Sequence, residues 1–117
     1  MRPTYLNSEK EFEEQISSLE SNTEVQSILI LMAENNNCRS EMIEPIIKRC
    51  SKTIIGGVFP QIIFETVLFH TGIVLIPLSF KLESLVFDFN KSLDVCIAEI
   101  TDFVRNISTE EQTLYCL

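Results

Sequence analysis

Cys38 is the residue best placed for chemistry. It follows a buried apolar run at residues 28–32 and precedes a predicted helix. Ligands gather at this position in open α/β sheets, and helix amides there can lower the pKa of a thiol. A cysteine nucleophile also needs a base, and His70 is the only histidine in the chain. Cys38 is therefore a candidate ligand-binding residue, and a structural thiol is the simpler alternative to a nucleophile.

His70 and the acidic residues offer weaker patterns. His70 adjoins a predicted turn at residues 71–72, and the cysteines lack the spacing of a zinc site, so we expect a solvent-facing turn histidine. Two carboxylate pairs have the i, i+3 spacing that could support acid–base chemistry, and solvated helix faces explain them more simply: Glu41 with Glu44, and Glu99 with Asp102. The sequence thus predicts no catalytic residue, no metal site and a protein that is not an enzyme.

The most distinctive stretch is Gly56-Gly57-Val58-Phe59-Pro60. A glycine pair allows a backbone to approach a ligand closely, and it also allows a bulge or a tight bend needed only for packing. No GxGxxG or GxxxxGK[ST] pattern surrounds the pair, so it is not a phosphate loop. The sequence alone leaves two interpretations open: the glycine pair lines a ligand site, or it forms a bulge or tight bend needed only for packing.

Composition bounds the class of protein. The chain has 117 residues, the size of one domain, and 45% of them are hydrophobic, as in ordinary globular proteins. A net charge of −8 with dispersed basic residues disfavours nucleic acid and anionic membranes as partners. The four cysteines have no CxxC spacing and the N-terminus has no signal-peptide core, so we expect reduced thiols and a cytoplasmic location. Residues 54–80 are apolar, but Pro60 and Pro77 interrupt them and argue against a membrane helix.

The periodicity of apolar residues predicts the elements that position these candidates. Ser8 and Glu11 form a capping box that opens a helix over residues 8–20. A second helix covers residues 40–51, with a start as late as Glu44 because of Pro45, and a third follows Asn90 or Ser92. Predicted strands lie at residues 28–32, at 53–55 before the interrupting glycine pair, and at 61–64, 67–69, 73–78, 82–89 and 113–117.

This order predicts one α/β or α+β domain over residues 1–117, with a mixed sheet and about three covering helices in the order α-β-α-β-β-β-β-α-β. The chain stops on an apolar run, so we interpret it as the N-terminal part of a longer protein.

The combination of a buried strand, a helix, TIIGGVFPQIIF and a hairpin leading to GIVLIPL resembles the N-terminal FIST domain, named for F-box and intracellular signal transduction. The resemblance covers residues 26–80, and residues 55–63 carry it most sharply. It implies a sensory module that binds a small ligand, such as an amino acid, and works with a C-terminal FIST domain or a signalling partner. It also implies a ligand near Gly56, Gly57 and Phe59.

The resemblance suggests haem only by analogy, because some members of that family take part in haem-based sensing. The resemblance transfers no haem ligand to this chain, because His70 is the only candidate and nothing around it marks it as one. We therefore expect no cofactor. Two alternatives to the sensory domain remain: a protein-interaction fragment that docks a C-terminal domain or a second copy through a sheet edge or apolar patch, and an enzyme that uses Cys38.

Overall fold

The computed structural model describes residues 2–35, 38, 40–84 and 90–107. It consists of two compact units, residues 1–82 and residues 83–117. Unit 1 contains every described strand and the first two helices, and unit 2 contains the third described helix. The described elements form an α+β fold in the expected order, with one additional short strand at the N-terminus.

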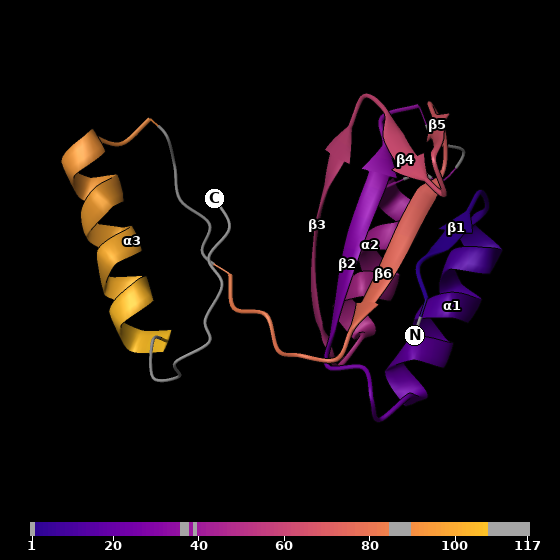
Figure 1. Ribbon diagram of the computed structural model, residues 1–117, viewed down its shortest axis with the longest axis horizontal. Helices are drawn as coiled ribbons and strands as arrows, with labels where there is room; N and C mark the ends of the chain where they lie inside the picture. The colour runs from indigo at the N-terminus through magenta and orange to yellow at the C-terminus, as the bar shows by residue number, and fades with distance from the viewer. Residues whose placement is uncertain (1, 36–37, 39, 85–89, 108–117) are drawn as a thin grey trace. The chain divides into compact units, whose positions relative to one another are not determined.

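Unit 1 is built on a four-stranded mixed sheet (Figure 1). Its strands, in spatial order, are β1 (Thr4–Leu6), β6 (Ile73–Leu78), β2 (Ser27–Ala33) and β3 (Thr53–Phe59). The central strand β2 runs parallel to β3 and antiparallel to β6, and β1 runs antiparallel to β6. The parallel pair is joined through helix α2 (Ser40–Arg49), the crossover that parallel strands require.

Helix α1 (Glu9–Ser21) confirms the capping box as a local signal. The Ser8 hydroxyl accepts a hydrogen bond from the Glu11 backbone N–H at 3.2 Å, and the Glu11 carboxylate accepts one from the Asn7 N–H at 3.3 Å. These contacts satisfy amides that have no partner inside the helix. Phe12 and Ile16 lie four residues apart on one face of the helix, and they are 0% and 2% exposed. This face therefore packs on the sheet.

Helix α2 begins earlier than Pro45 suggested. It starts at Ser40, the first residue of the predicted range 40–51, so Pro45 lies inside the helix and the later start that Pro45 allowed, at Glu44, is wrong. A proline removes one backbone donor and favours a helix boundary, but two buried side chains on either side of it, Ile43 and Ile46, anchor both turns in the core. Tertiary packing therefore carries the helix through the proline.

Helices α1 and α2 cover one face of the sheet (Figure 1), and the main core lies between them. Alternate residues of each strand point into it, as period-two alternation requires. Burying each aliphatic side chain of this kind stabilises the fold by roughly 1.5–3 kcal/mol. The strand residues buried in this core are Ile28, Ile30, Ile73 and Leu75.

The opposite face of the sheet is covered at one end by a hairpin, β4 (Ile62–Phe64) and β5 (Val67–Phe69). A second small core of Ala33, Ile62 and Val74 is buried there. Within unit 1 the hairpin leaves other apolar side chains of this face half-buried, including Leu29, Ile55 and Ile76. We call this surface of the sheet, opposite α1 and α2, the open face.

The hairpin strands and β6 confirm the strands expected at residues 61–64, 67–69 and 73–78. The strand expected at 82–89 is not seen at residues 82–84, and its remaining residues, like the strand expected at 113–117, lie outside the described part of the chain. The short strand β1 carries no pattern long enough to be recognised in the sequence.

Unit 2 contains helix α3 (Leu93–Ile107). The Ser92 hydroxyl accepts a hydrogen bond from the Val95 N–H at 3.4 Å, which identifies Ser92 rather than Asn90 as the capping side chain. An ion pair of 3.1 Å between Lys91 and Glu99 lies beside the first turns. None of the helices in the described ranges combines the length and the apolar character needed to cross a membrane.

Candidate functional site

The glycine pair lies inside strand β3, not between two strands. Residues 53–59 pair one for one with residues 27–33 of β2, without an extra residue on either strand. The expected interruption at Gly56 and Gly57 is therefore wrong, and the pair forms no bulge. Hydrogen bonding to β2 holds the backbone extended through both glycines, although glycine by itself disfavours a strand.

Each glycine meets a different neighbour. Gly56 lies opposite Ile30, and a β-carbon built on Gly56 would stand 2.9 Å from the β-carbon of Ile30 and would overlap its carbonyl oxygen. A β-carbon on Gly57 would touch the ring of Phe59 at 3.4 Å, an ordinary contact. Gly56 is thus required by the close approach of two backbones, which is a packing role but not the bulge or tight bend that the sequence left open.

A shallow groove of about 190 Å³ adjoins both glycines at the edge of the sheet. It exists because Gly56 has no side chain, and its other walls are apolar: Ile30, Met32, Ile47, Ile54 and Val58. No charged or polar side chain lines it. The groove suits an apolar group better than a small polar ligand.

The structure does not bring the four sequence-derived candidates to one site. Gly56 and Gly57 line the groove, Phe59 lies against Gly57 and is 43% exposed, and Cys38 is buried in the main core. Burial raises the pKa of the Cys38 thiol, and the nearby carboxylates of Glu9 and Glu11 raise it further. This environment opposes formation of a thiolate, the form a nucleophile or a metal ligand would need.

His70 is exposed in the turn after β5, as a turn histidine was expected to be. Among the described residues, no group of three or more histidine, cysteine, aspartate or glutamate side chains is arranged to hold a metal ion. His70 therefore belongs to no such group among these residues.

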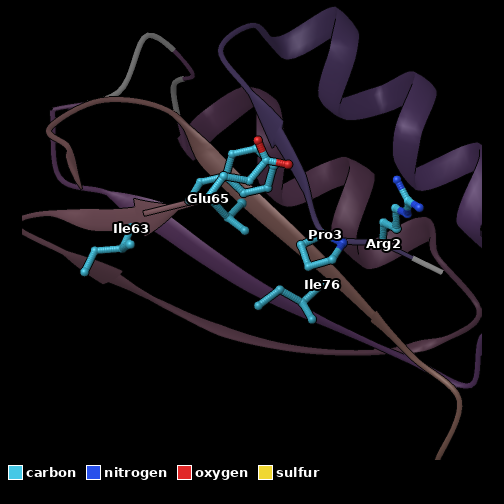
Figure 2. A pocket seen from close by; sticks show the side chains of 7 residues that line it. Arg2, Pro3, Ile63, Glu65 and Ile76 are labelled. Atoms are coloured by element: carbon cyan, nitrogen blue, oxygen red, sulfur yellow. The ribbon is translucent and has the colours of Figure 1, made fainter. Parts of the chain in front are cut away.

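A larger hollow, of about 280 Å³, lies on the open face (Figure 2). Its wall is mainly apolar, and two side chains of opposite charge, Arg2 and Glu65, also line it. In Figure 2 these two residues lie on either side of Pro3, which is next to Ile76. The apolar wall consists of Pro3, Ile63, Phe64, Val74 and Ile76. Small-molecule sites have a lining of this kind, and at about 280 Å³ the hollow is slightly smaller than their usual range of roughly 300–1,000 Å³.

Tyr5 fixes the hairpin that forms one side of this hollow. Its ring stacks on Phe69 with centroids 4.3 Å apart and lies 6.0 Å from the ring of Phe64. Its hydroxyl donates a hydrogen bond of 2.9 Å to the Thr71 carbonyl oxygen. Gly72, with φ +96°, lies against the same ring and has no room for a side chain. One aromatic residue of β1 therefore holds both the hairpin and the entry into β6.

The tip of the hairpin has an unusual backbone. Glu65 and Thr66 have φ values of 48° and 66°, the left-handed region that two-residue hairpin turns require. Asparagine and glycine usually occupy such positions, and a β-branched residue such as Thr66 is strained there. This turn carries Glu65 to the hollow.

Sequence reasoning missed Arg2, Glu65 and Ile76 as site residues. The strands at residues 61–64 and 67–69 were predicted, but the turn was expected at residues 70–72, before β6, so Glu65 was not marked as the turn residue that joins β4 to β5. Arg2 could not be found in this way, because β1 is short and its pairing with β6 links residues about seventy positions apart, such as Thr4 and Leu75.

Known proteins do not extend this picture. No protein-family model, curated protein or solved structure matches the chain. The site must therefore be interpreted from its own residues.

Proposed function

We propose that this chain is a cytoplasmic, non-enzymatic binding domain whose open face holds a small amphipathic ligand. The hollow lined by Arg2, Glu65 and apolar side chains carries the proposal. The apolar wall contacts the hydrophobic part of the ligand, and one or both charged residues contact its ionic groups. An amino acid with a large apolar side chain is the simplest member of this class.

The two opposite charges would determine how a ligand is oriented in the hollow. The guanidinium of Arg2 suits a carboxylate, and the carboxylate of Glu65 suits an ammonium group. Both side chains are exposed, so each contact is screened by water and contributes modestly. We therefore propose that apolar contact supplies most of the affinity and that the charged pair selects among ligands of similar shape.

The sensory role follows the FIST resemblance and remains part of this proposal. Ligand binding at the hollow would favour one arrangement of the hairpin and sheet over another and so bias contact with a C-terminal domain or a signalling partner. The strained turn at Glu65 and Thr66 supports this idea, since its backbone is held in a sparsely populated conformation next to the hollow.

Thermal unfolding with a panel of ligands tests the proposal. Phenylalanine and leucine should stabilise the protein in a saturable way, whereas phenylalanine amide and N-acetylphenylalanine each lack one ionic group and show which charge matters. At a ligand concentration of 100 times Kd, stabilisation of about 2.7 kcal/mol is expected. Arg2→Gln should weaken binding of ligands that carry a carboxylate about two- to fivefold, and Glu65→Gln should do the same for ligands that carry an ammonium group.

Matched controls are available on the helices. Lys10→Gln and Glu44→Gln remove the same charges from exposed positions of α1 and α2 that do not line the hollow. Equal effects of site and control variants, or no stabilisation by any ligand of the panel, would contradict the proposed function.

A second candidate function, interaction with another protein, is favoured by a different observation. Strand β3 ends the four-stranded sheet, so one side of its backbone is not paired within that sheet. This edge is independent of the hollow on the open face.

A further inference from the structure

Strand β3 presents the longer of the two edges of the sheet. It has seven residues, whereas β1 at the other edge has three. The Phe59 carbonyl oxygen accepts a hydrogen bond from the Glu34 N–H at 2.7 Å, so Phe59 faces the β2 side of the ladder. In a strand, every second residue faces the same neighbour. The N–H and C=O groups of Ile54, Gly56 and Val58 therefore face outward from the edge.

Within the part of the chain that the structure describes, this edge lacks the usual protection. Natural edge strands carry charged side chains, prolines or bulges that prevent pairing with another chain. The segment from Thr53 to Phe59 has no charged residue and no proline, and its ladder with β2 has no bulge. The side chain of Val58, one of the outward-facing residues, is 62% exposed. The edge therefore has the chemical character of a pairing surface.

We propose that β3 pairs antiparallel with β3 of a second copy, about a two-fold axis at Gly56. This register places Gly56 opposite Gly56 of the other copy and Ile54 opposite Val58. All of these residues direct their backbone groups outward, and each directly opposed pair of this kind exchanges two hydrogen bonds. An axis at Ile55 or Gly57 would leave one of these three residues without a partner inside β3, and an axis midway between two residues would oppose an outward-facing residue to one that faces β2.

A second copy suits this edge better than a charged partner. The chain has a net charge of −8, and like charges across an interface oppose self-association. Strand β3 adds nothing to this repulsion, since two copies of it oppose only uncharged side chains. The interface is the same patch on both chains, as a two-fold axis requires.

The groove beside Gly56 provides a place for the side chains of the other copy. In antiparallel pairs, the diagonal neighbours of a residue lie on the same face of the sheet, roughly 7–8 Å away. The diagonal neighbours of Gly56 are Ile54 and Val58 of the second copy. These two aliphatic groups enter the apolar groove of about 190 Å³ that the missing side chain of Gly56 leaves. The glycine thus serves the close approach to Ile30 and leaves space for the partner.

Mass measured against concentration tests the pairing in the full chain. Sedimentation equilibrium should show a shift from the 13.4 kDa monomer toward twice that mass as concentration rises from micromolar to near-millimolar. Val58→Lys places a charge at each of the two symmetric positions and should weaken dimerisation at least about tenfold. Val67→Lys makes the same charge change at a residue of β5 that is 52% exposed, and it should leave dimerisation unchanged.

A second variant and a second measurement distinguish loss of the dimer from misfolding of the monomer. Val58→Pro removes only an outward-facing N–H, so the monomer should keep its circular dichroism and lose the dimer. Hydrogen exchange by two-dimensional NMR should show amide protection at Gly56 and Val58 that grows with concentration, while the amide of Gly57 is protected at every concentration. A wild-type chain that stays monomeric, or a dimer that survives both Val58 variants, would overturn the proposal.

Discussion

Gly56 and Ile30 stand so close across the β2–β3 ladder that no side chain fits between them. A β-carbon at position 56 would lie 2.9 Å from the β-carbon of Ile30, and Ile30 itself is 4% exposed in the main core. Because neither the buried isoleucine nor the strand backbone can move away cheaply, this contact fixes the separation of two strands. It also predicts that the two glycines tolerate substitution unequally.

Substitution of Gly56 by alanine should therefore destabilise unit 1. Overpacking of this kind costs about 1–3 kcal/mol, and it should lower the urea midpoint of unfolding followed by circular dichroism. Gly57→Ala is the matched control, because its new methyl group would meet the Phe59 ring only at 3.4 Å. We expect a change within about 0.5 kcal/mol for this control. Equal losses at both positions would contradict the role given to Ile30.

Tyr5→Phe tests the tie between β1 and the entry into β6. The change deletes the hydroxyl that donates to the Thr71 carbonyl and keeps the ring that stacks on Phe69. A loss of about 0.5–1.5 kcal/mol in the free energy of unfolding is expected. Tyr5→Leu should cost about 0.5–1.5 kcal/mol more, because the aromatic pair is also lost. Equal stability of the two variants would show that the stacking contributes nothing.

Cys38 should react slowly with iodoacetamide near neutral pH. Its side chain is 4% exposed and its pKa is raised by burial and by the carboxylates of Glu9 and Glu11. Cys50 is only half-buried and provides an internal comparison. Mass spectrometry of the modified peptides should find Cys50 alkylated first, and Cys38 only when the fold opens. Faster alkylation of Cys38 would restore it as a candidate nucleophile.

The same raised pKa predicts a loss of stability in alkali. The folded protein holds the Cys38 proton more tightly than the unfolded chain, so this contribution is complete below the ordinary thiol pKa, about 8.5. It is lost as pH rises from there through the raised pKa of the folded state. Urea midpoints measured across this range should fall more steeply for the wild type than for Cys38→Ala, and parallel slopes would contradict the assignment.

Glu20 predicts the opposite dependence on pH. A hydrogen bond of 2.9 Å from the Ser51 backbone N–H lowers the pKa of its carboxyl, and the Ser51 hydroxyl and the charge of Lys52 act in the same direction. The stabilisation is present above the ordinary glutamate pKa and is lost as pH falls through the lowered value. Glu20→Gln should be less stable than the wild type at neutral pH, and the difference should vanish as pH falls through the lowered pKa of Glu20. Glu14→Gln, an exposed change on the same helix, is the matched control.

Local patterns accounted for much of the fold. Ser8 and Glu11 are three residues apart, and their capping contacts formed as the sequence predicted because both partners lie in one turn. Strand β2 was recognisable because a central strand is buried on both faces and needs a continuous apolar run. Patterns of this kind depend on neighbours in the chain, and no tertiary structure is needed to read them.

Other features depended on distant contacts. Pro45 marked a boundary in the sequence, yet packing of Ile43 and Ile46 against the sheet keeps α2 continuous through it. The strand β1 was missed because three residues acquire an extended conformation only by pairing with β6. For the same reason the hollow on the open face was not foreseen, since it joins Arg2 to Glu65 and Ile76.

The sequence by itself determined the kinds of elements, their order and the presence of a glycine pair that marks a close approach. Only the tertiary structure decided which residue lies against Gly56. That residue is Ile30, which is 26 positions earlier in the chain and stands opposite Gly56 in the β2–β3 ladder. Strand pairing chooses that partner through hydrogen bonds and shared burial, which no spacing within the glycine pair encodes. The physical reason is that a glycine specifies the space it leaves, while the fold specifies which atoms fill it.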